Sequence, residues 1–177
     1  MTATARQKNI FKTIFEKKEK RNTSHVFVVH RHEASTLHYD LRLEINGVLK
    51  CWAIPQGPSM NSHEKRLAIR VHDRPLSYVS FKGKVPDGNY ESGKVEIWDK
   101  GIFRPAGLMS GEDRDKRMLR QIREGNLTFV LKGKILNGSF KLLRLKSKNE
   151  TLWMLIKGND GYAVDHPFSS EDFTTQL

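Results

Sequence analysis

The fold is decided by residues 25–54, which read HVFVVHRHEASTLHYDLRLEINGVLKCWAI. Apolar and polar residues alternate through much of this stretch, as they do when successive side chains of a strand point to opposite faces. The alternation is interrupted after residue 31 and again after residue 45. The pattern therefore predicts three successive strands, at 25–31, 37–45 and 48–54.

Short apolar runs continue along the chain, with turn signals about every 8 to 12 residues. This pattern predicts further strands at 66–73, 93–99, 127–133, 139–146 and 151–157. Pro and Gly residues at 55–58 and 86–89 indicate turns between the strands, and Asn137-Gly138 predicts a tight hairpin. So many strands indicate a mainly β fold, whose antiparallel sheet must close or fold over as a barrel or a sandwich.

One segment, 111–125, has the pattern of a helix. Acidic residues stand at its start, Met118 and Ile122 fall at helical spacing, and Gly125 supplies a left-handed stop. We therefore expect one or two short helices beside the strands.

A chain of 177 residues is long enough for one domain with tails. Residues 1–22 are expected to form a basic, partly disordered arm, either a solvated tail or a contact with a partner's backbone. Residues 23–163 form the folded domain. Residues 164–177, with little to bury, are expected to be a flexible tail.

The charge is strongly positive: 31 Lys and Arg against 20 Asp and Glu give a net charge of +11. This favours a polyanionic partner, nucleic acid first. No apolar run approaches the roughly 20 residues that span a bilayer, and no secretory signal is evident. The single cysteine, Cys51, agrees with a reducing cytoplasm, and its apolar surroundings favour a buried thiol over a nucleophile.

The chemistry is predicted to lie on the strand at 37–45. His38, Asp40 and Arg42 share one face of it, and His32 can fold back from the preceding turn. Two imidazoles and a carboxylate are ligands for a divalent transition metal, and the Arg fork can grip a phosphoryl group. The alternative is a solvated strand on which a His happens to lie near an Asp.

A second strand offers a cationic face. Alternation places Arg66, Ala68, Arg70, His72 and Arg74 together, which suits a phosphate. A strand that only binds a phosphate backbone would not explain Asp40, because a carboxylate repels phosphates unless a cation lies between them. Tyr78 either places its hydroxyl at this site or fills the core.

Several motifs together resemble one known family, the 3′-phosphoesterase domain of bacterial DNA ligase D and its stand-alone archaeal and bacterial relatives. The likeness extends from about residue 25 to 163. It rests on residues 27–44 (FVVHRHEASTLHYDLRLE), 52–59 (WAIPQGPS), 65–68 (KRLA), 88–90 (GNY) and 98–101 (WDKG).

The resemblance implies a compact β-barrel that binds Mn²⁺, with Zn²⁺ or Co²⁺ as other candidates. It implies removal of a 3′-terminal ribonucleoside and then of the 3′-phosphate from DNA primer-template ends during non-homologous end joining. Partners would be a separate ATP-dependent DNA ligase, a polymerase/primase and Ku, in the prokaryotic cytoplasm at the nucleoid. The implied metal ligands are His32, His38 and Asp40. Arg42 and Arg66 are the implied contacts to the scissile phosphate, and Tyr78 matches a tyrosine of the same pocket.

Two departures from the family pattern bear on the chemistry. Where relatives have Val-Glu-Asp-His-Pro, this chain has His72 in place of the Glu and Arg74 in place of the His. Arg cannot act as a general acid at ordinary pH. We therefore hypothesise that His72 is the acid and that Arg74 adds charge at the phosphate. Gln56 also replaces a usual Lys, which removes one positive charge.

Three functions follow in order of preference. The first is a metal-dependent hydrolase of 3′-terminal phosphoesters. The second is a catalytically impaired, basic scaffold that binds DNA ends and recruits ligase or polymerase. The third is a general single-strand binding barrel, which would need more stacking aromatics on its cationic face than the sequence offers.

Overall fold

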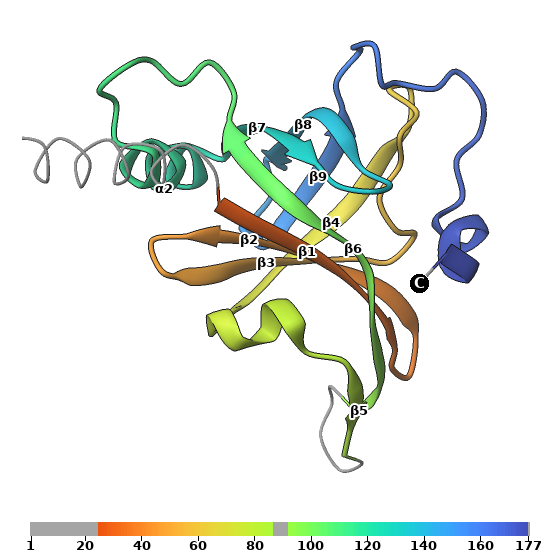
Figure 1. The fold of residues 1–177 in the computed structure, drawn as a ribbon. Helices are drawn as coiled ribbons and strands as arrows, with labels where there is room; N and C mark the ends of the chain where they lie inside the picture. The colour runs from red at the N-terminus through yellow and green to blue at the C-terminus, as the bar shows by residue number, and fades with distance from the viewer. Residues whose placement is uncertain (1–24, 87–91, 177) are drawn as a thin grey trace, which may run out of the picture.

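The structure is a computed structural model that describes residues 25–86 and 92–176. The predicted arm at 1–22 and most of the turn signal at 86–89 lie outside these residues. Figure 1 shows strands wound around a common centre, with the helix at residues 114–124 at one end and the C-terminal segment at the other. No helix in the described ranges is both long and apolar enough to cross a membrane.

Nine antiparallel strands form one sheet. They are β1 (His25–Glu33), β2 (Leu37–Ile45), β3 (Val48–Ile54), β4 (Lys65–Arg74), β5 (Gly83–Val85), β6 (Gly93–Pro105), β7 (Asn126–Lys132), β8 (Asn137–Arg144) and β9 (Leu152–Lys157). The order is β1-β2-β3-β4-β9-β8-β7-β6-β5. All eight strands expected from the sequence are present, and β5 is an additional short one.

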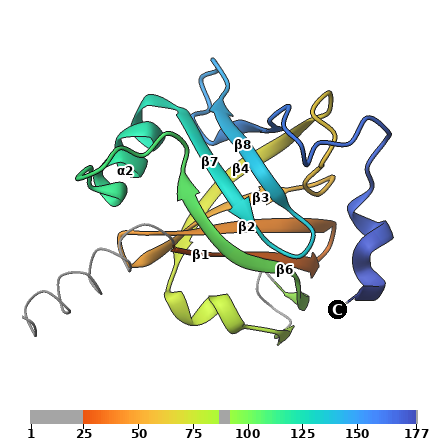
Figure 2. The same cartoon turned by 45° about the horizontal axis from the view of Figure 1, so that its top comes forward.

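The sheet closes because β1 pairs with both β2 and β6. β6 is long enough to pair with β1 through most of its length and with β7 near its end, so it bridges the two sides of the ring. β5 pairs only with β6 and stands outside the ring (Figure 2). The expected antiparallel β-barrel is therefore confirmed, with β1–β4 and β6–β9 as its wall.

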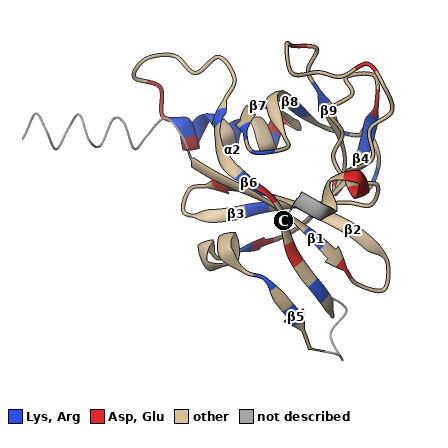
Figure 3. Ribbon diagram, turned by 45° about the vertical axis from the view of Figure 1, so that its right-hand side comes forward, with Lys and Arg blue, Asp and Glu red and all other residues tan. Residues whose placement is uncertain are grey.

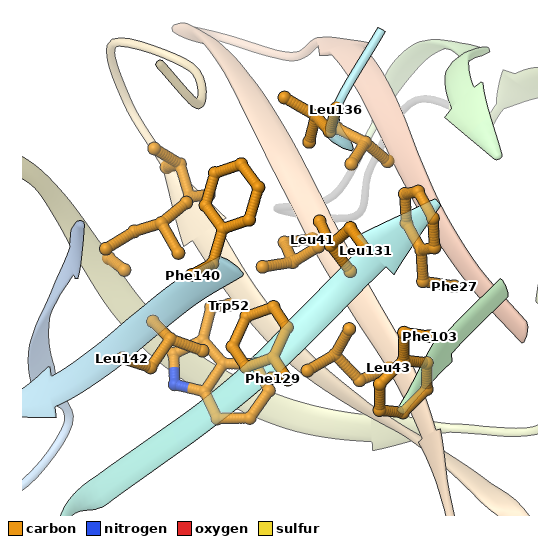
Figure 4. Close-up of a cluster of buried hydrophobic side chains, with 14 of the residues drawn as sticks. Phe27, Leu41, Leu43, Trp52, Phe103, Phe129, Leu131, Leu136, Phe140 and Leu142 are labelled. Carbon is orange, nitrogen blue, oxygen red and sulfur yellow. The ribbon is translucent and has the colours of Figure 1, made fainter. Parts of the chain in front are cut away.

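The inner face of the wall is apolar. Tyr39, Leu41, Leu43 and Ile45 of β2 point inward, as the alternation predicted, and meet Trp52 of β3. Figure 4 shows Phe and Leu side chains of the opposite strands closing on the same centre. Since burying one such side chain contributes roughly 1.5–3 kcal/mol, this core fixes which face of β2 is left outside.

The α-helix that the described residues contain, α2 (Arg114–Glu124), falls within the predicted segment. The Asp113 side chain accepts a hydrogen bond from the Lys116 amide at its start, and Gly125 adopts φ 74° at its end. Arg114, almost fully buried, contacts His25 of β1 and so ties α2 to the barrel.

The predicted turn at Asn137-Gly138 was wrong by a few residues. Lys132 pairs with Asn137, so the turn occupies 133–136 and Asn137 begins β8. The reason is a long-range contact: the buried Asp99 carboxylate accepts hydrogen bonds from the Lys134 and Leu136 amides at 2.9 and 2.8 Å. Burial raises the pKa of Asp99 above its ordinary value.

The segment after residue 163 is packed, in contrast to the loose attachment expected for 164–177. Phe168 and Ser170 are buried, and residues 170–176 form the 3₁₀ helix η2 (Ser170–Gln176). The indole of Trp98 donates to the Ser170 carbonyl at 3.0 Å, and the Ser170 hydroxyl donates to the Pro58 carbonyl at 2.7 Å. The expectation considered only how little apolar surface the segment itself carries, and not the barrel end that it covers.

Candidate metal centre

His32, His38 and Asp40 converge on the outer wall of the barrel. His32 on β1 lies directly across from His38 on β2, and Asp40 lies two residues further along β2. The inward side chains of Tyr39 and Leu41 oblige their neighbours in sequence to point outward. One ligand atom from each of the three lies within 4.8 Å of the others, and no other such group of His, Cys, Asp and Glu occurs in the described ranges.

The donor set fits a divalent metal. His38 Nδ1 lies 3.0 Å from the Thr36 carbonyl, which only accepts, so the proton of the neutral ring is on Nδ1. Its Nε2 lone pair then faces Asp40 Oδ1 at 3.7 Å, and His32 Nδ1 lies 3.8 Å from Asp40 Oδ2. A carbonyl that orients a ligating His is a usual feature of metal sites. Imidazole nitrogens and a carboxylate oxygen are ligand types that a divalent transition metal takes, so these three residues would hold such an ion.

Arg42 holds Asp40 from the other side. Its Nη2 donates to Asp40 Oδ2 at 2.8 Å, its Nε donates to His30 Nδ1 at 3.0 Å, and its Nη1 lies 3.5 Å from the Cys51 sulfur. Arg42 is buried in this network. Its orientation is therefore set by the protein, which is the condition for preorganised charge stabilisation.

Two buried groups beside Arg42 have shifted acidities. Burial, and next the positive charge of Arg42, lower the pKa of His30 to about 3. Burial raises the pKa of the Cys51 thiol, so Cys51 is the inert buried thiol expected from its sequence context.

His32, His38, Asp40 and Arg42 form the floor of a pocket of ≈ 300 Å³. Its roof is the segment 76–85, which carries the 3₁₀ helix η1 (Leu76–Ser80) and β5 and crosses outside β1–β3 (Figure 1). The Tyr78 and Phe81 rings of this connection stack at 5.1 Å. The pocket is lined by His32, His38, Asp40, Arg42, Ala53, Arg70, Val71, His72, Tyr78, Phe81, Val85 and Val95.

The structure brings together most of the site residues expected from the sequence. His32, His38, Asp40, Arg42, His72 and Tyr78 line the pocket. Arg74 lies at its edge, because the guanidinium carbons of Arg42 and Arg74 are each 5.3 Å from the centre of the Tyr78 ring.

Arg66 is not among the pocket residues. Its Nη2 donates to Glu64 Oε2 at 2.5 Å and to the Phe168 carbonyl at 2.7 Å. The chain therefore uses this guanidinium to hold the segment that follows residue 163.

The prediction that one face of β4 carries Arg66, Ala68, Arg70, His72 and Arg74 was wrong. Ala68 is fully buried in the core, and Arg70 pairs with the inward Trp52. Cys51 pairs with Val71 but Leu49 pairs with Arg74, so β4 has one extra residue there. Such a β-bulge reverses the alternation and turns Arg74 outward, toward the pocket.

Positive charge surrounds the site but is partly neutralised. Asp73 accepts from Lys50 at 2.5 Å and from Arg70 at 2.6 Å, and these bonds lower its pKa against the effect of burial. Figure 3 shows Lys and Arg on α2 and on several strands, β4 and β9 among them. The positive charge is thus spread over the barrel, and Arg42, Arg70 and Arg74 supply it at or beside the pocket.

Sequence reasoning missed two residues of the site, His30 and Phe81. The alternation of β1 contained a signal for His30, because His30 and His32 are two residues apart and share a face. Phe81 follows a 3₁₀ turn and has no periodic pattern that could have placed it.

Two imidazoles, a carboxylate and a fixed guanidinium meet in one outer pocket of this antiparallel barrel. These are the groups that a phosphoesterase domain needs. Comparison with known families agrees: the family model described as the DNA Ligase D 3'-phosphoesterase domain matches residues 30–144. The chain belongs to this family, as its motifs suggested.

Three relatives illustrate the similarity. The chain is similar to the "Multifunctional non-homologous end joining protein LigD" of Pseudomonas aeruginosa, at 41% identity over 138 residues, 77% of this chain and 15% of that protein. The protein of the same name from Mycolicibacterium smegmatis is 36% identical over 123 residues, 70% of this chain and 16% of that protein. The "Multifunctional non-homologous end joining DNA repair protein LigD" of Mycobacterium tuberculosis is 47% identical over 77 residues, which are 44% of this chain and 10% of that protein. The chain thus spans about a sixth or less of the length of these relatives.

Proposed function

We propose that the chain is a metal-dependent phosphoesterase that processes 3′ ends of DNA during repair by non-homologous end joining. It removes a 3′-terminal ribonucleoside and the 3′-phosphate, and so leaves a 3′-hydroxyl. The observation that carries the proposal is the convergence of His32, His38 and Asp40 beside Arg42 in one pocket. The family and the names of the relatives support the reaction and the pathway.

His32, His38 and Asp40 would hold the ion, Mn²⁺ in the first place and Zn²⁺ or Co²⁺ as alternatives. A bound divalent cation there would act as a Lewis acid and would lower the pKa of water. The mixture of imidazole and carboxylate ligands suits these metals better than Mg²⁺ or Ca²⁺, which prefer oxygen ligands alone.

The remaining residues of the pocket bind and orient the ester. Arg42 and Arg74 offer positive charge next to the Tyr78 ring, and they would stabilise the charge that grows on the phosphoryl oxygens. The Tyr78 hydroxyl can donate to the same group. Arg66, held by Glu64 and Phe168, has a structural role in this mechanism.

The leaving oxygen needs a proton, and His72 is the residue of the pocket that can supply it. Arg74 keeps its proton at working pH, whereas His72 lines the pocket and is exposed to solvent, from which it can recover a proton. His72 is therefore the proposed general acid.

The proposed substrate is a primer-template whose primer strand ends in a ribonucleotide or a 3′-phosphate. The proposed partners are a separate ATP-dependent DNA ligase, a polymerase/primase and Ku, and the names of the relatives, which are non-homologous end joining proteins, support this pathway. The net charge of +11 supports binding to such a polyanion.

A labelled primer-template ending in one ribonucleotide tests the proposal. We expect trimming that requires Mn²⁺ and is lost in Asp40→Ala. Asp165→Ala is the matched control, because Asp165 is a fully exposed carboxylate distant in sequence from the pocket. Trimming that persists without metal, or that survives Asp40→Ala, would contradict the mechanism.

One observation favours a second candidate, a DNA-end-binding scaffold with impaired catalysis. Arg74 stands where the family usually has His, and Arg cannot donate a proton. Such a scaffold would bind primer-template ends with the same affinity in the unaltered chain and in Asp40→Ala, and neither would release a nucleoside. Turnover by the unaltered chain alone would exclude it.

A further inference from the structure

His30 lies fully buried on β1, between the floor of the pocket and its roof. Its Nδ1 lies 3.0 Å from Arg42 Nε, and its Nε2 lies 3.0 Å from the Phe81 carbonyl. One imidazole thus connects the barrel wall that carries the metal-ligand candidates to the connection that covers them.

The two hydrogen bonds determine the state of the ring. Arg42 Nε always carries a proton and can only donate, so His30 Nδ1 must be the acceptor. The Phe81 carbonyl can only accept, so His30 Nε2 must carry the proton and donate. A single tautomer of the neutral ring satisfies both partners.

The bond at Nδ1 fixes Arg42. A guanidinium is planar, so an anchored Nε also sets the directions of Nη1 and Nη2. Nη2 then points at Asp40 Oδ2, 2.8 Å away. The orientation of a metal-ligand candidate therefore depends on His30 through one intervening side chain.

The bond at Nε2 fixes the roof. The Phe81 amide donates to the Tyr78 carbonyl at 3.2 Å, and the two rings stack. Holding the Phe81 carbonyl against the wall thereby holds Tyr78 over Arg42. Without this bond, the segment that carries η1 would lose a buried hydrogen bond to the barrel wall.

We propose that His30 is a positioning residue, which orients Arg42 and Asp40 through Nδ1 and docks the Tyr78–Phe81 segment through Nε2. The inference rests on the proposed function for its catalytic consequence. Its structural part, the docking of the segment, stands without it.

Two variants separate positioning from simple filling of the core. His30→Gln keeps an acceptor and a donor about as far apart as the two ring nitrogens, so both bonds can form again. His30→Leu fills a similar volume and removes both bonds. Each variant is assayed as the full chain for thermal stability, Mn²⁺ affinity by electron paramagnetic resonance, kcat and KM on the ribonucleotide-ended primer, and amide hydrogen exchange of residues 76–85.

We expect His30→Leu to weaken Mn²⁺ binding and to lower kcat, each by about tenfold or more, as when the partner of a metal ligand is lost. The KM of His30→Leu should change by less than about threefold, because the substitution alters few of the groups that bind the duplex. Exchange at 76–85 should accelerate at least about tenfold. His30→Gln should restore all three measurements to within about threefold of the unaltered chain.

Equal behaviour of the Leu and Gln variants in these assays would overturn the proposal, because it would leave His30 only a packing role. If His30→Leu does not fold, the Gln variant decides: slow exchange at 76–85 together with unchanged Mn²⁺ affinity supports positioning, and loss of either refutes it. If the unaltered chain shows no Mn²⁺-dependent turnover, the proposed function fails. Hydrogen exchange then still shows whether His30 docks the roof.

Discussion

Glu171 of η2 forms a bidentate ion pair with Arg31 of β1. The Arg31 Nε donates to Oε1 and its Nη2 donates to Oε2, both at 2.9 Å. The Tyr39 hydroxyl donates to the same carboxylate. Arg31 and Tyr39 are opposite each other on β1 and β2, on the inner face of the barrel end. The Glu171 carboxylate therefore holds η2 against the end of the barrel. It binds residues on the inner face of β1 and β2, whereas the candidate metal ligands lie on the outer face.

Removing this carboxylate should destabilise the fold without altering the pocket. We expect Glu171→Ala to lower the free energy of unfolding by about 1–2 kcal/mol, because the partly buried Tyr39 hydroxyl loses its acceptor and Arg31 its bidentate partner. Urea unfolding measures the change, and Asp165→Ala should remain within about 0.5 kcal/mol of the unaltered chain. A Glu171→Ala protein as stable as this control would show that η2 does not hold the barrel end.

The same pair should make stability depend on acid. The hydrogen bond from Arg31 is the main reason that the pKa of Glu171 lies below its ordinary value of 4.5. A carboxyl whose pKa is lower when folded stabilises the protein above its unfolded pKa, and that stabilisation is lost as pH falls through the folded value. The unfolding free energy of the unaltered chain should therefore decline more steeply below about pH 4.5 than that of Glu171→Gln, whose side chain does not titrate. Parallel curves for the two proteins in urea titrations would contradict this.

Arg42 should not tolerate replacement by Lys. A lysine keeps the charge but has one nitrogen in place of three, so it cannot serve Asp40, His30 and the substrate together. We expect the single-turnover rate of Arg42→Lys to fall by about 100-fold, with primer-template affinity at fixed salt nearly unchanged. Lys65→Arg, a reverse exchange on the exposed end of β4, is the control and should keep the full rate. Arg42→Lys with more than half of the rate would remove Arg42 from the proposed machinery.

His72 should be required only when the leaving group needs a proton. We expect His72→Ala to lower the rate on a ribonucleotide-ended primer by about 100-fold. The rate on a 3′-(4-nitrophenyl phosphate) end should fall by less than about threefold, because nitrophenolate leaves without protonation. His63→Ala, an exposed loop histidine, serves as the control. Equal losses on both substrates would show that His72 does not act as the acid.

Much of the fold followed from the sequence because it depends on local alternation. The period of two in 37–45 places Tyr39 and Leu41 inside and His38 and Asp40 outside, and the structure has this arrangement. The cluster of candidate ligands was predictable for the same reason, since strand pairing across one short turn brings His32 next to His38.

The failures have a common physical cause: contacts between residues far apart in the chain. Asp99 moves the 133–136 turn, and a bulge opposite Leu49 reverses the alternation of β4. Glu171 reaches Arg31 across 140 positions. No local pattern encodes such contacts, so the roles of Arg66 and Arg74 could not be told apart from spacing alone.

Arg66 and Arg74 therefore provide the sharpest comparison between sequence and structure. Both are basic residues of β4, but Arg66 is bonded to Glu64 and Phe168, whereas Arg74 lies over Tyr78 at the pocket. We expect Arg74→Ala to lower kcat/KM on the ribonucleotide-ended primer by about tenfold or more, with little effect on the melting temperature. Arg66→Ala should lower the melting temperature by several degrees, because Glu64 loses its ion pair and the Phe168 carbonyl loses its donor, while kcat/KM measured well below that temperature stays within about threefold. Thermal unfolding and steady-state assays on the same preparations test both halves, and the reverse pattern would mean that Arg66 contacts the phosphate.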